Sequence, residues 1–516
     1  MFASVHSSTL SGIDATPVTV EVHLGRGLPG FDIVGLPEAA VRESRVRVKA
    51  AIQNSHFQLE PRHAVLNLAP AELRKHGASL DLPIALALLA AHGVCPADRM
   101  ANTLFLGELS LTGELVGVRG ALAHLRSAAA RGVSTAVIPA RHGSVATYAR
   151  GIRVKLAHSL RDVVEWLLGL LELPDAVELP TPRAGLPPGD FADVHGQDSA
   201  KRALEIAAAG RHNVLLFGPP GAGKTMLARR LPSILPPPTD EELADIATIR
   251  GASFLHEGDA GDEVCRPFRA PHHTASTVAI VGGGDPIRPG EVTLAHGGVL
   301  FLDELPEFQR NAIESLRVTM EDGVAVISRA RQRVSMPARP LVIASMNPCP
   351  CGHLGDRRRT CTCSPDRIAS YRAKLSGPLL DRFDMHVALP AVQVKALRAH
   401  GGAEKSESIR GRVVRAKVFA AQDPAARSAL SSTSIKELAR TANATAMMLL
   451  DEIAETLHLS ARGYQKVLSV ARTIANLEES ESVVAHHVAE AAQYRVLDRR
   501  SQSVELVPQS NSLASK

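Results

Sequence analysis

The chain has 516 residues, of which 45% are hydrophobic and 22% charged, and its formal net charge is +5. This length and ordinary globular composition predict about two to four domains, and the mild positive charge is compatible with nucleic acid without establishing it. Apolar runs stay shorter than the roughly eighteen residues of a membrane helix, and six cysteines are too few for a disulfide scaffold. The first residues lack the basic and long apolar regions of a signal peptide, so we expect a cytoplasmic protein without membrane contact.

The N-terminal third alternates strand-like and helix-like segments. Within residues 1–168, runs such as VTVEVHL and HAVLNLA favour strands, and LDLPIALALLAAHG favours a helix. This alternation predicts an α/β or α+β domain. Residues 169–189 are rich in proline, glycine and acidic side chains and carry little periodicity, so we interpret them as a linker.

The remainder of the chain divides by composition. Residues 190–390 again alternate strands and helices and contain the strongest motifs. A polar stretch over 391–409 is expected to be a connector, and 410–500 has few glycines or prolines and is expected to be helical. The tail, 501–516, is expected to be disordered.

A phosphate-binding loop is predicted between an apolar strand, NVLLF, and an amphipathic helix, MLARRLPSIL. The stretch GPPGAGKT fits G-x-x-x-x-G-K-[ST] in full. Glycines let backbone N–H groups curl around a phosphate, and the helix N-terminus adds partial positive charge. We expect the lysine to contact the β- and γ-phosphates of ATP and the threonine hydroxyl to bind Mg²⁺. The predicted nucleotide-binding residues are Gly218, Pro219, Pro220, Gly221, Ala222, Gly223, Lys224 and Thr225.

A second motif places two carboxylates at the end of a strand. The segment GGVLFLDEL over 297–305 is an apolar run that ends in Asp303 and Glu304. A carboxylate beside the phosphate loop can hold Mg²⁺, and the next one can polarise the attacking water. We therefore expect Asp303 to act with Thr225 at the metal and Glu304 to be catalytic.

A basic hairpin is predicted over 321–340. The run VAVIS, a basic tip and the run RVSMP read as two strands joined by a turn. The side chains at its tip that could bind the backbone phosphates of DNA are Arg329, Arg331 and Arg333. Arginines that neutralise phosphates give salt-sensitive binding, although a solvated basic hairpin would have the same sequence.

Four cysteines cluster in the segment NPCPCGHLGDRRRTCTCSPD. Two C-x-C pairs could form a tetrahedral zinc site within an insertion over 349–363. Four free or redox-active thiols are the alternative. The predicted structural zinc ligands are Cys349, Cys351, Cys361 and Cys363.

These motifs, together with three further segments, resemble the AAA+ ATPases, α/β proteins with a P-loop module and a helical lid. Asn347 comes at the end of the apolar run LVIASM and resembles the first sensor, which positions the hydrolytic water. Arg382 in SGPLLDRFD resembles the arginine finger, and Arg462 in LSARGYQKVL resembles the second sensor. A finger supplied in trans completes the site only between subunits, so the resemblance implies a homohexamer.

The segments FRAPHHTASTVAIVGGG, PGEVTLAHGGVLFLDELPEF and ASMNPCPCG are similar to the magnesium-chelatase-like ComM/YifB family. The resemblance runs from residue 1 to about 500. It implies a ring helicase that binds single-stranded and branched DNA and drives branch migration during natural transformation, in contact with recombination proteins. A magnesium-chelatase-like metal-insertion motor and an AAA+ protein remodeller are the alternatives.

The segment LFLGELSLTGELVGVRGALAHLRSAAARGVSTAVIP resembles the Lon protease domain, a ribosomal S5-like α+β fold. Lon proteases use a serine and a desolvated lysine base. The alignment puts Leu122 at the position of the lysine and Ser79 near that of the nucleophile. We therefore expect residues 1–168 to keep the fold without peptidase activity.

Overall fold

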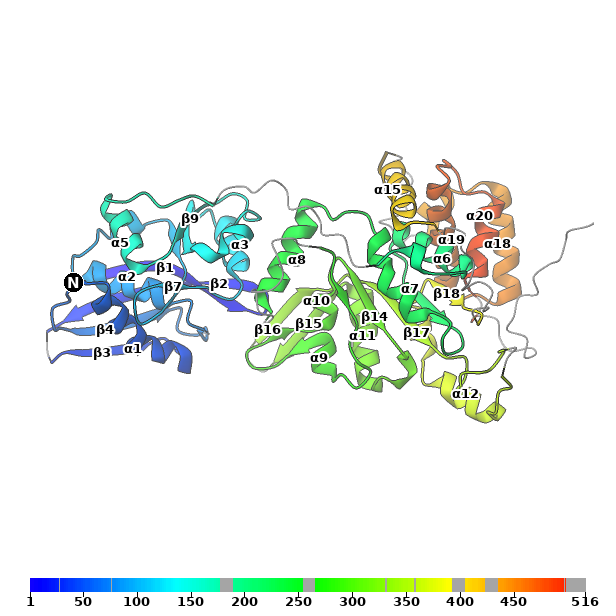
Figure 1. Cartoon of the computed structure of the whole chain (residues 1–516), viewed down its shortest axis with the longest axis horizontal. Helices are drawn as coiled ribbons and strands as arrows, with labels where there is room; N and C mark the ends of the chain where they lie inside the picture. Colours follow the sequence, from blue (N-terminus) through cyan, green and yellow to red (C-terminus); the bar gives the residue numbers. More distant parts are fainter. Residues whose placement is uncertain are drawn as a thin grey trace, which may run out of the picture.

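The computed structural model contains an N-terminal domain, a central domain and a C-terminal helical domain, arranged side by side (Figure 1). None of its described helices is long and apolar enough to cross a membrane. The structure describes the whole chain except residues 27, 76, 177–188, 254–264, 330–331, 357–358, 392–403, 423–434, 496 and 498–516.

The N-terminal domain is built on a seven-stranded mixed sheet of order β3-β4-β2-β1-β5-β8-β9. Its first half is largely antiparallel, and β5, β8 and β9 run parallel. The strands are β1 (Phe2–Ser11), β2 (Asp14–Gly25), β3 (Gly30–Val34), β4 (His63–Ala69), β5 (Thr103–Phe105), β8 (Thr135–Pro139) and β9 (Arg153–Ala157), with a small hairpin of β6 (Glu108–Leu109) and β7 (Leu115–Val116). The helices are α1 (Ala39–Asn54), α2 (Asp81–Ala91), α3 (Ala121–Ala130), α4 (Gly143–Ala146) and α5 (Leu160–Leu168).

The sequence of α2 explains its central position. Nearly all of its side chains are buried, as expected for a helix that lacks a polar face. It packs between the sheet and α1 and forms much of the domain core.

The predicted linker 169–189 begins with residues that pack on the N-terminal domain. The N–H of Ala176 donates to the carbonyl of Val154 over 2.8 Å, and Lys155 contacts Asp175 over 3.1 Å. The rest of this linker from 177 to 188 lies outside the described residues.

The central domain contains a five-stranded parallel sheet of order β11-β14-β17-β10-β18. Its three middle strands are entirely buried, which is why they read as continuous apolar runs. The strands are β10 (Val214–Phe217), β11 (Phe268–Arg269), β14 (Val299–Leu302), β17 (Leu341–Met346) and β18 (Met385–Ala388). The helices are α6 (Asp198–Gly210), α7 (Lys224–Arg230), α8 (Asp240–Ala252), α9 (Thr277–Val281), α10 (Glu291–Leu294), α11 (Arg310–Asp322), α12 (Pro365–Ala373) and α13 (Gly377–Leu380).

The predicted hairpin is present as β15 (Val324–Arg329) and β16 (Gln332–Pro337), which pair antiparallel. It follows α11 directly and leads into β17. A second short pair, β12 (Gly282–Gly283) and β13 (Arg288–Pro289), lies in the segment before β14.

The described part of the C-terminal region is helical. Its first helix begins at Ser406, inside the predicted connector, and the tail 501–516 lies outside the described residues. The helices are α15 (Ser406–Gln422), α17 (Ile435–Arg440), α18 (Ala444–Leu457), α19 (Ala461–Leu477) and α20 (Ala485–Gln493). The apolar face of α19 packs against α6 and α20, so the helical domain shares one core with the central domain. The predicted fold class, a P-loop α/β module with a helical lid after an α+β domain, is confirmed.

The N-terminal domain docks on α8 and on the hairpin. Leu122 of α3 lies in an apolar cluster with three residues of α8, and the N–H of Gly120 donates to the carbonyl of Gly251 over 2.8 Å. The turn between β1 and β2 contacts β16, where a Cβ added at Gly12 would lie 2.7 Å from a methyl group of Val334. The N-terminal domain therefore contacts the hairpin directly.

Candidate active site

The phosphate loop connects β10 to α7, which begins at Lys224. Gly221 and Gly223 have φ angles of +75° and +90°, a region that favours glycine. A Cβ added at Gly218 would lie 2.3 Å from the carbonyl oxygen of Leu389, because the loop passes close to the end of β18. The glycines of the motif thus satisfy the backbone geometry of a loop whose N–H groups can surround a phosphate.

Lys224 is buried within this loop. Its Nζ donates to the carbonyls of Gly218 at 2.6 Å and Pro219 at 3.1 Å, and to Oδ1 of Asn347 at 3.0 Å. Burial lowers its pKa, while the charges of Asp303 and Glu304 act in the opposite direction. A phosphate would offer this ammonium group a full negative charge in place of neutral oxygens.

Asp303 follows β14 and lies beside the phosphate loop. Thr225 Oγ1 donates to one of its carboxylate oxygens over 2.9 Å, and Ser345 Oγ donates to the other over 2.5 Å. Ser345 also accepts the N–H of Glu304 over 3.1 Å. The sequence analysis missed Ser345, although a buried serine in the apolar strand LVIASM is a signal that could have identified it.

Glu304 has a left-handed backbone, with φ of +55°. Together with Asn347 it lines a cavity of about 440 Å³, whose walls also include Tyr371 of α12. Nδ1 of His273 lies 4.0 Å from a carboxylate oxygen of Glu304, a contact that the sequence analysis did not identify. The cavity leaves room for a water molecule beside the carboxylate of Glu304.

The four predicted catalytic residues form two groups. Glu304 and Asn347 follow strands of the parallel sheet at its carboxyl edge, next to the phosphate loop. Arg382 precedes β18 and therefore lies at the opposite edge of the sheet. Arg462 of α19 joins it there, because both arginines contact the carboxylate of Glu321.

Several contacts fix this arginine group at the amino edge of the sheet. Asp384 accepts the N–H of Asn213, the residue before β10, over 2.7 Å. Lys466, one turn along α19 from Arg462, contacts Asp384 over 2.7 Å. The strand β10 thus separates the arginines from the phosphate loop of the same chain.

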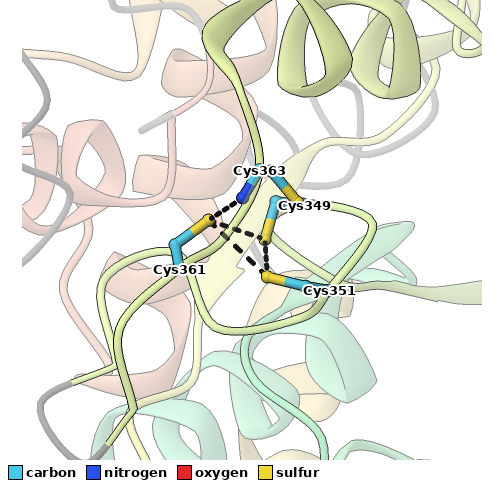
Figure 2. A group of neighbouring side chains, drawn as sticks. All are labelled: Cys349, Cys351, Cys361 and Cys363. Carbon is cyan, nitrogen blue, oxygen red and sulfur yellow. Dashed lines mark hydrogen bonds between the residues drawn. The ribbon is translucent and has the colours of Figure 1, made fainter.

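The four predicted zinc ligands lie together (Figure 2). Their sulfur atoms are all within 4.8 Å of one another, with 3.3 Å between Cys349 and Cys351 and 3.6 Å between each of these and Cys361. A tetrahedral zinc with bonds of about 2.3 Å needs sulfur atoms about 3.8 Å apart, so the cluster fits this metal. Backbone hydrogen bonds from His353 and Thr362 lower the pKa of Cys351 to about 5, whereas burial and the neighbouring cysteines raise the pKa of Cys361 and of Cys363. The thiolate that a metal requires is therefore favoured at Cys351 but not at these two residues.

The cysteine segment also touches the phosphate loop. A Cβ added at Gly352 would lie 2.7 Å from the ring of Pro220. The two cysteine pairs are therefore positioned to stiffen the chain beside the nucleotide site.

Two of the three hairpin arginines can be located. Arg329 and Arg333 are both exposed near the turn, and Arg331 lies outside the described residues. Neither is brought near the phosphate loop, since the hairpin emerges from the amino edge of the sheet.

In the N-terminal domain, Leu122 is 1% exposed and contacts α8. Ser79, whose carbonyl accepts the N–H of Gly107 over 3.1 Å, immediately precedes the α2 region. The side chain at the position of the Lon lysine is therefore part of the contact between domains.

Comparisons with known proteins agree with this architecture. The family profile described as magnesium chelatase, subunit ChlI, matches residues 190–397. A second profile, described as subunit ChlI of Mg-chelatase, matches residues 20–142. The profile of the ChlI C-terminal region matches 403–495.

Individual proteins are similar over nearly the whole chain. The competence protein ComM of Haemophilus influenzae is 41% identical over 97% of this chain and 99% of its own length. The protein YifB of Escherichia coli is 41% identical over 96% of this chain and 97% of its own. Lon protease 2 of Bacillus subtilis is 28% identical over 28% of this chain and 27% of its own length. The chain thus belongs to the ComM/YifB family of magnesium-chelatase-like AAA+ ATPases.

Proposed function

We propose that the protein is an ATP-driven DNA motor. Lys224 binds the β- and γ-phosphates, and Thr225 with Asp303 holds the Mg²⁺, whose role when bound is to neutralise phosphate charge. Glu304 accepts a proton from the attacking water, and Asn347 orients that water. The observation that carries this assignment is the convergence of these five side chains at one edge of the sheet.

We infer that hydrolysis requires neighbouring subunits. Arg382 and Arg462 lie at the edge of the sheet opposite to their own phosphate loop. In a ring, this edge of one subunit can face the carboxyl edge of the next, so that both arginines contact the neighbour's nucleotide. The family resemblance supports a homohexamer, and an arginine finger contributes about 10³–10⁵ to the rate in related NTPases.

The cysteine cluster is proposed to hold one structural zinc. Four sulfur ligands close a tetrahedral site, which leaves no open position for catalysis. The contact between Gly352 and Pro220 means that the metal would stabilise the loop beside the nucleotide rather than take part in chemistry.

We propose that the hairpin binds the DNA. Arg329 and Arg333 are exposed on the two paired strands, and Arg331 lies between them in the sequence. Guanidinium groups suit phosphate better than neutral peptide. The similarity to a protein named for competence supports a role in natural transformation. Within that role we propose single-stranded or branched DNA as the substrate and branch migration as the process.

The deciding experiment measures the ATPase rate of the hexamer with no DNA, with single-stranded DNA and with a synthetic three-stranded junction. We expect stimulation by DNA and ATP-dependent movement of the junction. Replacing Arg329, Arg331 and Arg333 with alanine should abolish both and reduce the salt slope of binding by up to about 0.9 per lost duplex contact.

A matched control removes three exposed cations from α1 by changing Arg42, Arg45 and Lys49 to alanine. Equal losses in both triple variants would mean that general surface charge, not the hairpin, binds DNA. A wild-type ATPase that responds to unfolded protein but not to DNA would replace this proposal with the protein-remodelling alternative. Stimulation only by a porphyrin-metallating partner would favour the metal-insertion motor.

A further inference from the structure

Glu321 joins the two arginines to each other. Its carboxylate forms an ion pair with Arg382 and accepts a hydrogen bond from Nη2 of Arg462 over 3.4 Å. The side chain of Arg382 is 10% exposed, whereas that of Glu321 is 46% exposed. One carboxylate therefore balances two guanidinium groups that would otherwise repel each other.

The same residue lies at the base of the hairpin. Glu321 is in the last turn of α11, and β15 begins at Val324 after the left-handed Gly323. The N–H of Ala338, just after β16, donates to the carbonyl of Gly323 over 2.9 Å. Only Asp322 and Gly323 separate Glu321 from the first strand of the hairpin, so a displacement of the hairpin base would act close to Glu321.

One hydrogen-bond donor of Arg382 lacks a partner among the described residues. Its Nε atom is buried and has no hydrogen-bond partner in the described part of the chain. A buried donor without a partner costs free energy. A neighbouring γ-phosphate could satisfy this group, so the pairing with Glu321 competes with the use of the arginine in hydrolysis.

We propose that Glu321 is a positioning residue that holds Arg382 and Arg462 away from the neighbouring nucleotide until DNA displaces the hairpin. This inference rests on the proposed function, in which the arginines act in trans and the hairpin binds DNA. It adds Glu321 as the residue that couples DNA binding at the hairpin to the action of the arginines in hydrolysis. In this role Glu321 acts through the two arginines and not directly on ATP or DNA.

The test is the Glu321→Gln variant, which keeps the size of the side chain and removes its charge. The basal ATPase rate of the hexamer should rise about two- to fivefold, as expected for loss of a partly exposed ion pair. The rate with DNA should change little, so the ratio of the two rates should fall towards one. Adding Arg382→Ala to this variant should abolish the rise, because the effect acts through that arginine.

Asp322→Asn is the matched control, because this exposed carboxylate is the next residue of α11 and pairs with neither arginine among the described contacts. Its rates should equal those of the wild type. Glu321→Asp, which keeps the charge, should retain the wild-type ratio and provides a second variant if Glu321→Gln fails to assemble.

An unchanged basal rate in hexameric Glu321→Gln, or an equal rise in Asp322→Asn, would overturn the inference. A purely structural role would lower both rates together and leave their ratio unchanged, which would also overturn it. If DNA fails to stimulate the wild type, the proposed function fails, while the basal rates still decide the role of Glu321.

Discussion

Replacing Ser345 with alanine should impair magnesium-dependent hydrolysis without preventing nucleotide binding. The Ser345 hydroxyl donates to Asp303 over 2.5 Å and accepts the N–H of Glu304 over 3.1 Å. It therefore ties the carboxylate of Asp303 and the backbone of Glu304 to β17. The ammonium group of Lys224 is held by Gly218, Pro219 and Asn347 rather than by this hydroxyl, so ATP without metal should still bind.

The magnitude follows from the two hydrogen bonds that are lost. A hydrogen bond to a charged group contributes about 1.5–3 kcal/mol, and the N–H of Glu304 would also lose its acceptor. If most of this stabilisation is needed in the transition state, kcat/KM should fall about 10- to 100-fold, at roughly 1.4 kcal/mol for each factor of ten. The Mg²⁺ concentration for half-maximal activity should rise, because Asp303 would be less well oriented.

The assay is steady-state hydrolysis over a magnesium titration, with binding of a fluorescent ATP analogue measured in parallel. Ser233→Ala is the control, because Ser233 is also a buried serine and donates to the carbonyl of Arg230 over 2.7 Å, away from the carboxylates. An Ser345→Ala variant with the magnesium dependence and kcat/KM of the wild type would refute the role assigned to this hydroxyl. If Ser345→Ala lost analogue binding as strongly as activity, the hydroxyl would also be needed for nucleotide binding. That result would refute the expectation that it acts only on the metal and the attacking water.

Four further predictions test the remaining assignments. Glu304→Gln should bind ATP and hydrolyse it at least about 100-fold more slowly, as measured by binding and single-turnover rates. Mixing Arg382→Ala with Lys224→Ala should partly restore hydrolysis at mixed interfaces, whereas full activity of Arg382→Ala alone would contradict a finger in trans. Metal analysis should find about one zinc per chain in reduced protein purified without chelator, and none after all four clustered cysteines are changed to serine. The N-terminal domain should not cleave unfolded protein, and any cleavage lost in Ser79→Ala would show that this expectation is wrong.

The sequence by itself determined the features that depend on neighbouring residues. The phosphate loop needs glycines, a lysine and a threonine at fixed spacing between a strand and a helix, so GPPGAGKT was sufficient to predict it. The buried parallel strands are continuous apolar runs, and the hairpin is two short runs around a basic turn. The paired C-x-C spacing predicted that the four cysteines lie together, which the structure confirms.

Only the tertiary structure decided which distant segments meet. Ser345 reaches Asp303 because β14 and β17 are adjacent in the sheet, although the chain between them forms α11 and the hairpin. Arg382, Arg462 and Glu321 come from three segments, and their meeting depends on how α19 packs on the central domain. Leu122 is likewise an interface residue only because α3 docks on α8. Helical and strand periodicities encode which face of an element is buried, but not its partner. That choice depends on the complementary packing of whole surfaces, which local sequence does not specify.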